Sequence, residues 1–412
     1  MLRSSPKPQP PPPVTAHETM KLAETPEVEK LEVPLQPEKK IPAINIPVAG
    51  GAVDPSVDPI QRSFYDDPKL SYTIDKPMTN WDEKRRAWLQ NHPSFSDKSD
   101  RVLLITGTQP TPCRHPTGDH LLLRFFKNKV DYCRIHGYDI FYNNAFMHPK
   151  MRSYWAKIAV IRAAMLSHPE AEWIYWVDSD AVFTDMDFKL PLNKYKNHNM
   201  VVDGWPSLIF EKRSWIGLNA GVILIRNCQW SMEFLDAWAS MGPQTPNYEK
   251  WGRILQATLS DKTYPESDDQ SAIVYLLLKE KHKWADKIYI ENEYSFQGYW
   301  AFLVDKYENI TKNYDRVEKQ VRRLRRRHAE KVTLSYAGYG KESGKRPFIT
   351  HFTGCQPCSG DHNKIYAGDA CYKGMVRALN FADNQVLRNF GLVHKDLLDS
   401  ASLLPLPYDF PS

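Results

Sequence analysis

The chain has 412 residues, of which 42% are hydrophobic, and its 54 lysines and arginines nearly balance 49 aspartates and glutamates. This length accommodates one full α/β catalytic domain plus a tail, and a net charge of +5 is too small to indicate a strongly anionic partner. The longest weakly polar stretch near the start, "IPAINIPVAGGAV", has 13 residues and two prolines, which is short of the ~20 residues of a membrane span.

Residues 1–79 have the composition of a disordered, Pro-rich stem. Thirteen of the 31 prolines fall within the first 60 residues, together with many lysines and glutamates and few aromatic residues. Such a segment buries too little apolar surface to fold on its own. Aromatic content rises from "NWDEKRRAWLQNHP" onward, where a helix is expected. We therefore place the folded catalytic domain at residues 80–412.

Strands and helices alternate in the first part of this domain. "RVLLITGT" is a continuous apolar run typical of a strand that is buried on both faces. A helix with Gly137 as its C-cap follows, and the His-Pro step ends the next helix. The predicted elements are strands at 101–108, 139–144 and 173–183 and helices at 120–138 and 154–172. Their order predicts right-handed βαβ units and a doubly wound, mostly parallel sheet.

The second half of the domain is less regular. The C-terminal third is rich in Gly, Cys and His, and we expect it to be mostly loop around "FITHFTGC". The elements predicted before it are strands at 200–210, 217–227 and 287–296 and helices at 231–241 and 269–281.

The stretch "WIYWVDSDAVF" sets Asp178 and Asp180 after a buried apolar run. Ligands of open parallel sheets lie beyond the carboxyl ends of the strands, and residues two apart on an extended chain face the same side. Paired carboxylates there suit a divalent ion that holds a diphosphate. A turn or a helix cap is the alternative. The second copy, Asp185-Met186-Asp187, shows that the bare pattern also arises by chance.

Two further groups are candidates for chemistry. Asp268, Asp269 and Gln270 precede an apolar helix; capping explains one aspartate, and the other groups suit sugar hydroxyls. His351 follows a predicted strand, where a histidine is usually only packed or hydrogen-bonded. If its loop folds back toward Asp180, an imidazole beside two carboxylates favours a transition ion such as Mn²⁺ over Mg²⁺ or Ca²⁺.

Several motifs have simpler explanations. The basic run "VRRLRRRH" at 321–328 lacks the aromatic residues of a single-strand binder, so we interpret it as a solvated face and expect no nucleic acid. Cys355-Gln356-Pro357-Cys358 has no second CxxC to complete a zinc site, and structural disulfides or buried thiols are favoured over a redox pair. Asn309 begins a sequon that would accept an N-glycan in a secretory lumen.

Four segments, "WVDSDAVFTDMDF", "WIGLNAGVILIRNCQW", "DDQSAIVYLL" and "ITHFTGCQPCSGDH", closely resemble the plant family 34 glycosyltransferases. The resemblance covers about residues 80 to 400. That family contains xyloglucan 6-xylosyltransferases and galactomannan and glucomannan α-1,6-galactosyltransferases. Membership implies a GT-A type α/β fold with a mostly parallel sheet and helices on both faces, a UDP-sugar donor, Mn²⁺ and retention of the anomeric configuration.

The resemblance also implies roles for individual residues. Asp178, Asp180 and His351 match the metal site. Asp268, Asp269 and Gln270 match the acidic motif near the reacting carbon. The matching donor-binding residues are Gly107, Thr108, Asp178, Ser179, Asp180, Asn219, Ala220, Gly221, Gly354 and Gln356.

Two departures from the family pattern matter. The xylosyltransferase branch has a lysine where this chain has Gln356, whereas the galactosyltransferase branch resembles "HFTGCQPCSG" as it stands here. Gln356 therefore indicates UDP-galactose and a mannan or glucomannan acceptor. Family members are also type II Golgi membrane proteins with lumenal catalytic domains, whereas this sequence shows only the Pro-rich stem before its catalytic domain.

Three alternatives stay open at this stage. A xyloglucan 6-xylosyltransferase would share the fold and the metal. A non-catalytic scaffold of a polysaccharide synthase complex would lack UDP and Mn²⁺ binding. A nucleic-acid binder would use residues 321–328. Assembly with itself or with other Golgi polysaccharide synthases is compatible with the first two.

Overall fold

The computed structural model describes residues 77–96, 101–144, 153–320 and 345–406. Nearly all of the predicted stem, and the basic run at 321–328, lie outside these ranges. The described elements belong to one unit that spans Asp67–Ser412. None of the helices in these ranges is long and apolar enough to cross a membrane.

The central sheet of the described residues consists of β1 (Val102–Gly107), β2 (Asp139–Asn143), β3 (Trp173–Val177), β5 (Met200–Gly204), β6 (Leu218–Arg226) and β7 (Ile288–Glu291). The strand order is β2-β1-β3-β6-β5-β7. β6 is antiparallel to both of its neighbours, and all other pairs are parallel. The carboxyl ends of the other five strands therefore lie along one edge, where β6 begins.

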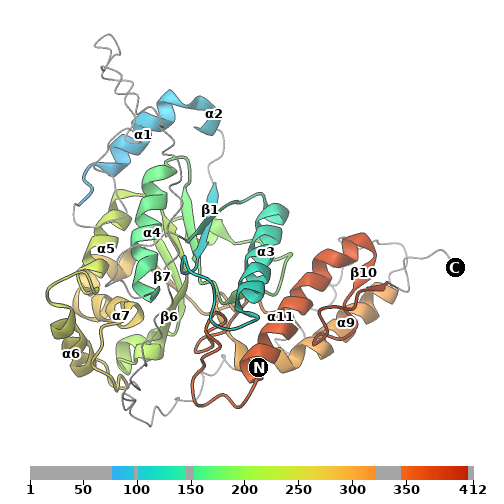
Figure 1. The fold of residues 1–412 in the computed structure, drawn as a ribbon. Helices are drawn as coiled ribbons and strands as arrows, with labels where there is room; N and C mark the ends of the chain where they lie inside the picture. The colour runs from blue at the N-terminus through green and yellow to red at the C-terminus, as the bar shows by residue number, and fades with distance from the viewer. Residues whose placement is uncertain (1–76, 97–100, 145–152, 321–344, 407–412) are drawn as a thin grey trace, which may run out of the picture. The chain divides into compact units, whose positions relative to one another are not determined.

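Helices cover both faces of this sheet (Figure 1). α3 (Gly118–His136) leads from β1 outward to β2, and α4 (Ser153–Ser167) leads from β2 back past β1 to β3. Because such crossovers are right-handed, opposite directions along the sheet place the two helices on opposite faces. Tyr132 of α3 packs in one buried cluster with Leu104 and Tyr175, whereas α4 contacts β3 and α5. The predicted α/β class, with a mostly parallel central sheet and helices on both faces, is confirmed.

The helices expected early in the chain begin and end close to their predicted positions. Gly137 caps α3 in the left-handed conformation at φ 70°, as predicted. α1 is anchored to the sheet layer, since Trp81 Nε1 donates to Asn227 Oδ1 at 2.7 Å. The sequence pattern missed α6. The other helices of this part are α1 (Trp81–Asn91), α2 (Pro93–Ser96), α5 (Gln229–Ala239), α6 (Tyr248–Thr258), α7 (Asp269–Lys279) and α8 (Lys281–Trp284).

A small sheet adjoins the carboxyl edge. It contains β4 (Ala181–Phe183), β9 (Ile349–His351) and β8 (Gly298–Tyr299), in that order. The single strand predicted over 173–183 is therefore wrong in extent: β3 ends at Val177, and the chain leaves the large sheet to pair with β9. In that pairing Ala181 lies opposite His351.

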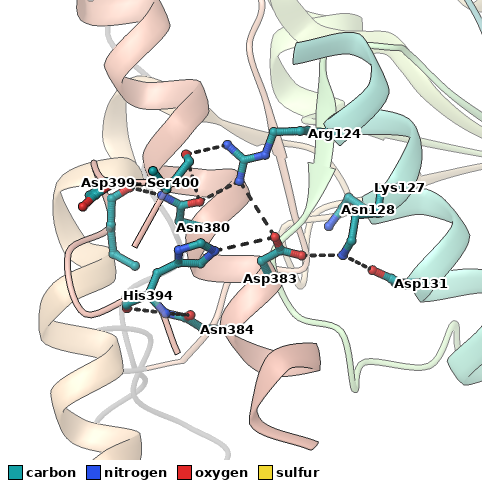
Figure 2. A network of polar contacts seen from close by, with 12 residues as sticks. Arg124, Lys127, Asn128, Asp131, Asn380, Asp383, Asn384, His394, Asp399 and Ser400 are labelled. Atoms are coloured by element: carbon teal, nitrogen blue, oxygen red, sulfur yellow. Dashed lines mark hydrogen bonds and ion pairs between the residues drawn. The ribbon is translucent and has the colours of Figure 1, made fainter. Parts of the chain in front are cut away.

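The prediction that the C-terminal third is mostly loop is wrong. It contains α9 (Tyr307–Gln320), α11 (Ala370–Leu387), β10 (Leu392–Val393) and β11 (Leu404–Pro405). The sequence pattern missed α11 because Asn380 and Asn384 interrupt its apolar face. Both asparagines are nevertheless buried. Their amides donate to the carbonyls of Leu397 and His394 at 2.9 Å. α3, α11 and α9 lie side by side (Figure 1), and polar contacts join α3 to α11 (Figure 2).

Two predicted strands are too long. The strand expected at 200–210 stops at Gly204, because Pro206 has no backbone donor and a π-helical turn follows. The strand expected at 287–296 stops at Glu291. Short helical turns fill much of the remainder: η3 (Leu192–Tyr195), η4 (Ser207–Glu211), η5 (Trp215–Gly217), η6 (Ala285–Lys287), η7 (Trp300–Phe302), η8 (Val304–Lys306) and η10 (Arg388–Phe390).

Candidate functional site

The structure brings together Asp178, Asp180 and His351, which we call the acidic centre. Their candidate ligand atoms all lie within 4.8 Å of one another. His351 Nε2 is 3.2 Å from Asp180 Oδ1 and 3.8 Å from Asp178 Oδ2. The imidazole is buried, whereas the two carboxylates keep partial exposure. The group lies at the carboxyl edge of the sheet, where ligands of such sheets bind.

The two carboxylates converge through a turn rather than through an extended strand. The backbone N–H of Ala181 donates to the carbonyl of Asp178 at 3.1 Å. This turn is needed because the chain crosses from β3 to β4, in a different sheet. The sequence argument from strand alternation therefore gave the correct grouping for the wrong reason.

Side chains of α3 form hydrogen bonds to the backbone of this turn and of the strand that follows it. The Nζ of Lys129 donates to the carbonyls of Ala181 at 2.7 Å and Ser179 at 3.3 Å. Asn128 binds both backbone groups of Phe183, at 2.8 and 3.0 Å. Lys129 is fully buried, and burial lowers its pKa to about 7 despite the raising effect of Asp180 and Asp178. Two side chains of one helix therefore fix the backbone that presents the acidic centre.

Lys157 connects the acidic centre to the second predicted motif. Its Nζ lies 2.8 Å from Asp269 Oδ2 and 3.4 Å from Asp178 Oδ1, and it donates to the carbonyl of Ala220 at 2.7 Å. The sequence analysis missed Lys157, because one lysine in the apolar helix α4 gives no signal of its own. Its burial and the three polar partners of its Nζ become visible only in the fold.

Negative charge exceeds positive charge around these residues. Burial raises the pKa of Asp269 to about 6, against the lowering effect of Lys157 and with the help of Asp268 and Asp178. Burial opposes the charge of Lys157, yet Asp178 and Asp269 raise its pKa above the usual value. Burial is the main cause for Asp269, with Asp268 and Asp178 adding to it, whereas for Lys157 the two neighbouring carboxylates outweigh burial. A bound divalent cation would correct this imbalance.

The local structure fits such an ion. A carboxylate pair with one imidazole is a donor set for a transition ion, and His351 directs Nε2 toward both carboxylates. A β-carbon at Gly221 would collide with the ring of His351. Gly221 is therefore required where the strand passes the imidazole.

Asn219, Ala220 and Gly221 lie at the start of β6, where the pairing with β5 is interrupted. Val202 pairs with Ile223, but the next residue of β5 pairs with Asn219. Within this interruption Ala220 accepts from Lys157 Nζ at 2.7 Å and donates to Gln270 Oε1 at 3.4 Å. Asp178 N–H donates to the Gly221 carbonyl at 2.8 Å, and the side chain of Asn219 accepts from Gly221 N–H at 2.7 Å.

The three residues of the second motif have different surroundings. Asp268 is the N-cap of α7 and accepts from Ser271 N–H at 2.7 Å, and Lys262 neutralises it. Asp269 pairs with Lys157. Gln270 accepts from Ala220 N–H at 3.4 Å and donates to the carbonyl of Trp215 at 2.9 Å. Of these three residues, only Asp269 and Gln270 connect to the acidic centre or to β6. Asp269 does so through Lys157, and Gln270 through Ala220.

Gly107 and Thr108 end β1 at the same edge. A β-carbon at Gly107 would collide with the carbonyl of Asn143, and Thr108 Oγ1 is 2.7 Å from the hydroxyl of Tyr142. Because Ile105 pairs with Trp176, β1 ends level with the start of the acidic turn. The structure therefore places these two residues at the predicted edge, one strand from the acidic centre.

Gln356 and Gly354 lie in the loop that follows His351. Gly354 has φ 80°, a conformation that favours glycine. Gln356 is exposed and lines a cavity of about 350 Å³ together with His115, His362 and Tyr372. Two disulfides fasten this loop, Cys113–Cys358 and Cys355–Cys371.

The prediction that the cysteines form structural disulfides or thiols, and not a zinc site or a redox pair, is confirmed. The two cysteines of the CxxC segment do not pair with each other, and each binds a cysteine elsewhere. Cys133 and Cys228 are free thiols.

The second Asp-x-Asp copy is not part of the acidic centre, since Asp187 lies 3.7 Å from the guanidinium of Arg346. Asn309 is exposed in the first turn of α9.

Comparisons with known proteins agree with these features. A model of the galactosyl transferase GMA12/MNN10 family matches residues 98–362. Galactomannan galactosyltransferase 1 of Cyamopsis tetragonoloba is 62% identical over 361 residues, which cover 86% of this chain and 83% of that protein. Glycosyltransferase 6 of Arabidopsis thaliana is 57% identical over 378 residues, or 89% and 88% of the two chains. Probable xyloglucan 6-xylosyltransferase 3 of Arabidopsis thaliana is 49% identical over 335 residues, or 81% and 68%.

Two solved structures are also similar. A glycosyltransferase involved in the glycosylation of the major capsid of PBCV-1 is 13% identical, with a TM-score of 0.37, over 62% of this chain and 95% of that one. Galactosyltransferase LgtC in complex with donor and acceptor sugar analogues is 10% identical, with a TM-score of 0.33, over 68% and 95%.

Proposed function

The chain belongs to the galactosyl transferase GMA12/MNN10 family and is a glycosyltransferase, and we propose that it transfers galactose from UDP-galactose in α-1,6 linkage onto a β-1,4-mannan or glucomannan backbone. The observation that supports this most is the acidic centre at the carboxyl edge of the sheet, in a chain 62% identical to a galactomannan galactosyltransferase. The sequence boundary at residue 80 remains our proposed start of the catalytic domain.

In this proposal Asp178, Asp180 and His351 hold Mn²⁺. The bound ion would offset the negative charge that develops on the departing UDP. Lys157 keeps Asp178 and Asp269 oriented, since its Nζ contacts both carboxylates. Lys129 and Ser179 fix the turn that presents the diphosphate-binding side chains.

Gly107 and Thr108 would lie along the nucleotide, and Asn219, Ala220 and Gly221 beside the donor sugar. Asp269 and Gln270 would face the sugar near the reacting carbon. Asp268 would act indirectly, because its carboxylate is already bound by the start of α7 and by Lys262.

Retention of configuration is best explained by attack of the acceptor O6 on the face that UDP leaves, with the proton passing to a phosphate oxygen. A stable covalent intermediate needs a free nucleophile on the opposite face. Gln270 offers only an amide there, and its two ends are engaged by Ala220 and Trp215. Asp269 is held by Lys157.

Gln356 is the basis for choosing galactose over xylose. Gly354 and Gln356 belong to the loop that begins at the metal-binding histidine, where a lysine would face the leaving diphosphate in the xylosyltransferase branch. Xyloglucan 6-xylosyltransferase activity is the second candidate, because a probable enzyme of that kind is 49% identical. A non-catalytic scaffold is disfavoured by the intact acidic centre.

We further propose a Golgi membrane protein of type II orientation with a lumenal catalytic domain. Two disulfides fit an oxidising compartment, and the exposed Asn309 would be available for an N-glycan there. Assembly with itself or with other polysaccharide synthases remains compatible with this location.

A donor-by-acceptor assay tests the function. The purified protein with Mn²⁺ is given UDP-galactose or UDP-xylose, each with manno-oligosaccharides or cello-oligosaccharides. We expect the largest turnover with UDP-galactose and manno-oligosaccharides, and a product that an α-galactosidase cleaves. Higher turnover with UDP-xylose and cello-oligosaccharides would establish the second candidate, and no turnover with any pair together with absent UDP binding would establish a scaffold.

A further inference from the structure

One buried acidic side chain near the carboxyl edge has no role in the proposed function. Asp203 is the fourth residue of β5 and is only 6% exposed. Its hydrogen bond is long, since the backbone N–H of Gln297 donates to Oδ1 at 3.4 Å. Among the residues that the structure describes, no cationic side chain lies within ion-pair distance of it. A buried carboxyl with so little compensation is unusual and costly.

The neighbouring acid shows what full compensation looks like in the same layer. Glu291 lies opposite Asp203 in the β5–β7 pairing and is fully buried. Its carboxylate accepts from Lys194 Nζ at 2.8 Å and from Tyr195 OH at 2.5 Å. Burial raises the pKa of Asp203 well above its usual value, and Glu291 raises it further. The carboxylate of Glu291 therefore has strong hydrogen-bonding partners within the protein, whereas the carboxyl of Asp203 has only one long hydrogen bond.

Asp203 also lies where the regular pairing of β5 with β6 is interrupted. On its other side, the β5–β6 pairing jumps from Val202–Ile223 to Asp203–Asn219. Irregularities of this kind re-aim side chains and are common next to active sites. Asn219, directly across from Asp203, is only half-buried. The carboxyl of Asp203 thus sits beside the segment that we propose for the donor sugar.

The strand order indicates which sugar would reach it. The acidic centre follows β3, the proposed donor-sugar segment begins β6, and Asp203 is the last residue but one of β5. Along this edge, in the proposed function, the diphosphate therefore comes first and the donor sugar second. The next strand in this order is β5, and we assign the edge beyond it to the other substrate.

We propose that Asp203 is an acceptor-binding residue whose carboxyl oxygens accept hydrogen bonds from hydroxyl groups of the backbone sugar that receives galactose. A carboxyl group can bind two neighbouring hydroxyls at once in either protonation state, as a double acceptor or as one donor and one acceptor. This inference rests on the proposed function, because it requires a polysaccharide acceptor at the carboxyl edge.

The test compares the wild-type protein with Asp203→Asn and Glu291→Gln, using manno-oligosaccharides of six residues as acceptor. The asparagine keeps an oxygen for Gln297 N–H but replaces the second carboxyl oxygen with an amide NH2 group. We expect the acceptor KM of Asp203→Asn to rise about tenfold or more, the loss typical of leaving a buried hydrogen-bonding group without its partner. UDP affinity and the rate of UDP-galactose hydrolysis without acceptor should be unchanged.

Glu291→Gln is the matched control, since it alters a buried acid one strand away. It should lower the melting temperature and leave the acceptor KM unchanged. Should Asp203→Asn not fold, Asp203→Ser provides the same comparison. An unchanged acceptor KM, or an equal loss of UDP affinity, would overturn the proposal. If the wild type instead prefers UDP-xylose and cello-oligosaccharides, the proposed function fails, and the KM comparison with that acceptor still decides the role of Asp203.

Discussion

Two clusters of acidic and histidine side chains in this protein differ in their charge balance. The first, between α3 and α11, is centred on Asp383 (Figure 2). Asp383 lies 2.6 Å from Lys127 Nζ, 3.9 Å from Arg124 Nη2 and 3.8 Å from His394 Nε2. Three basic groups therefore converge on Asp383, and one of them, Lys127, also contacts Asp131 at 2.7 Å.

The acidic centre has the opposite balance. Asp178 and Asp180 face one imidazole, and the nearby Lys157 is shared with a third carboxylate, Asp269. Lys129 reaches only backbone carbonyls of the turn. The residue types are similar in the two clusters. What distinguishes the proposed binding site from the structural contact is its excess of negative charge and its place at the carboxyl edge.

The largest effect is expected from Asp180→Ala. Transfer should fall about 100-fold or more, because one lost carboxylate leaves the cation and the diphosphate poorly held. The melting temperature should stay close to that of the wild type, since removal of one acid relieves repulsion. Steady-state rates and a thermal melt measure both. The control is Asp187→Ala in the second Asp-x-Asp copy, which should be mild; wild-type rates in Asp180→Ala would show that the ion binds elsewhere.

Asp383→Asn should have the reverse profile. The free energy of unfolding should fall by about 1–3 kcal/mol, because Arg124 and His394 lose a carboxylate partner in a partly buried position and Lys127 keeps only Asp131. Turnover of the folded fraction should not change. Urea unfolding and initial rates below the melting temperature check this. Loss of activity without loss of stability would mean that the α3–α11 cluster also serves the site.

Gln356→Lys adds a positive charge to the loop that follows His351 of the acidic centre. The lysine should tighten UDP by about tenfold, the value of a charge-assisted contact, and slow product release more than it speeds chemistry. Inhibition constants for UDP and competition between UDP-galactose and UDP-xylose measure the effect. We interpret Gln356 as a marker of the galactosyltransferase branch and not as the residue that sets the donor. A switch of donor preference toward UDP-xylose would contradict that interpretation.

The smallest effect concerns pH. Burial alone would raise the pKa of Asp383, but hydrogen bonds from His394 and Lys127 and the charges of Lys127 and Arg124 lower it below its usual value. A carboxyl with a lowered pKa stabilises the fold above its unfolded value near 4 and loses that contribution as the pH falls through the folded value. The stability difference between wild type and Asp383→Asn should therefore shrink in acid. A difference that grows in acid would refute the pairing.

The sequence predicted the elements whose pattern is local. The strand ending at Gly107 and the helix capped by Gly137 follow directly from apolar runs and a glycine. The grouping of Asp178 with His351 was predicted only conditionally, because it depends on pairing between β4 and β9.

Other features depend on contacts between distant segments. Lys157 and Lys129 look like ordinary lysines within helices, and only the fold shows that their Nζ atoms lie beneath the site. α11 was missed because its buried asparagines bind backbone carbonyls that lie later in the chain. The disulfide partners of Cys355 and Cys358 likewise cannot be deduced from spacing.

Titration of the purified protein with Mn²⁺, in the absence of nucleotide, tests the comparison most directly. Calorimetry or electron paramagnetic resonance gives the number of ions bound. We predict one ion per chain for the wild type and for Asp383→Asn, and none at the same concentrations for Asp180→Asn, which keeps the shape of the side chain. Equal binding by Asp180→Asn and the wild type, or loss of binding in Asp383→Asn, would contradict the account.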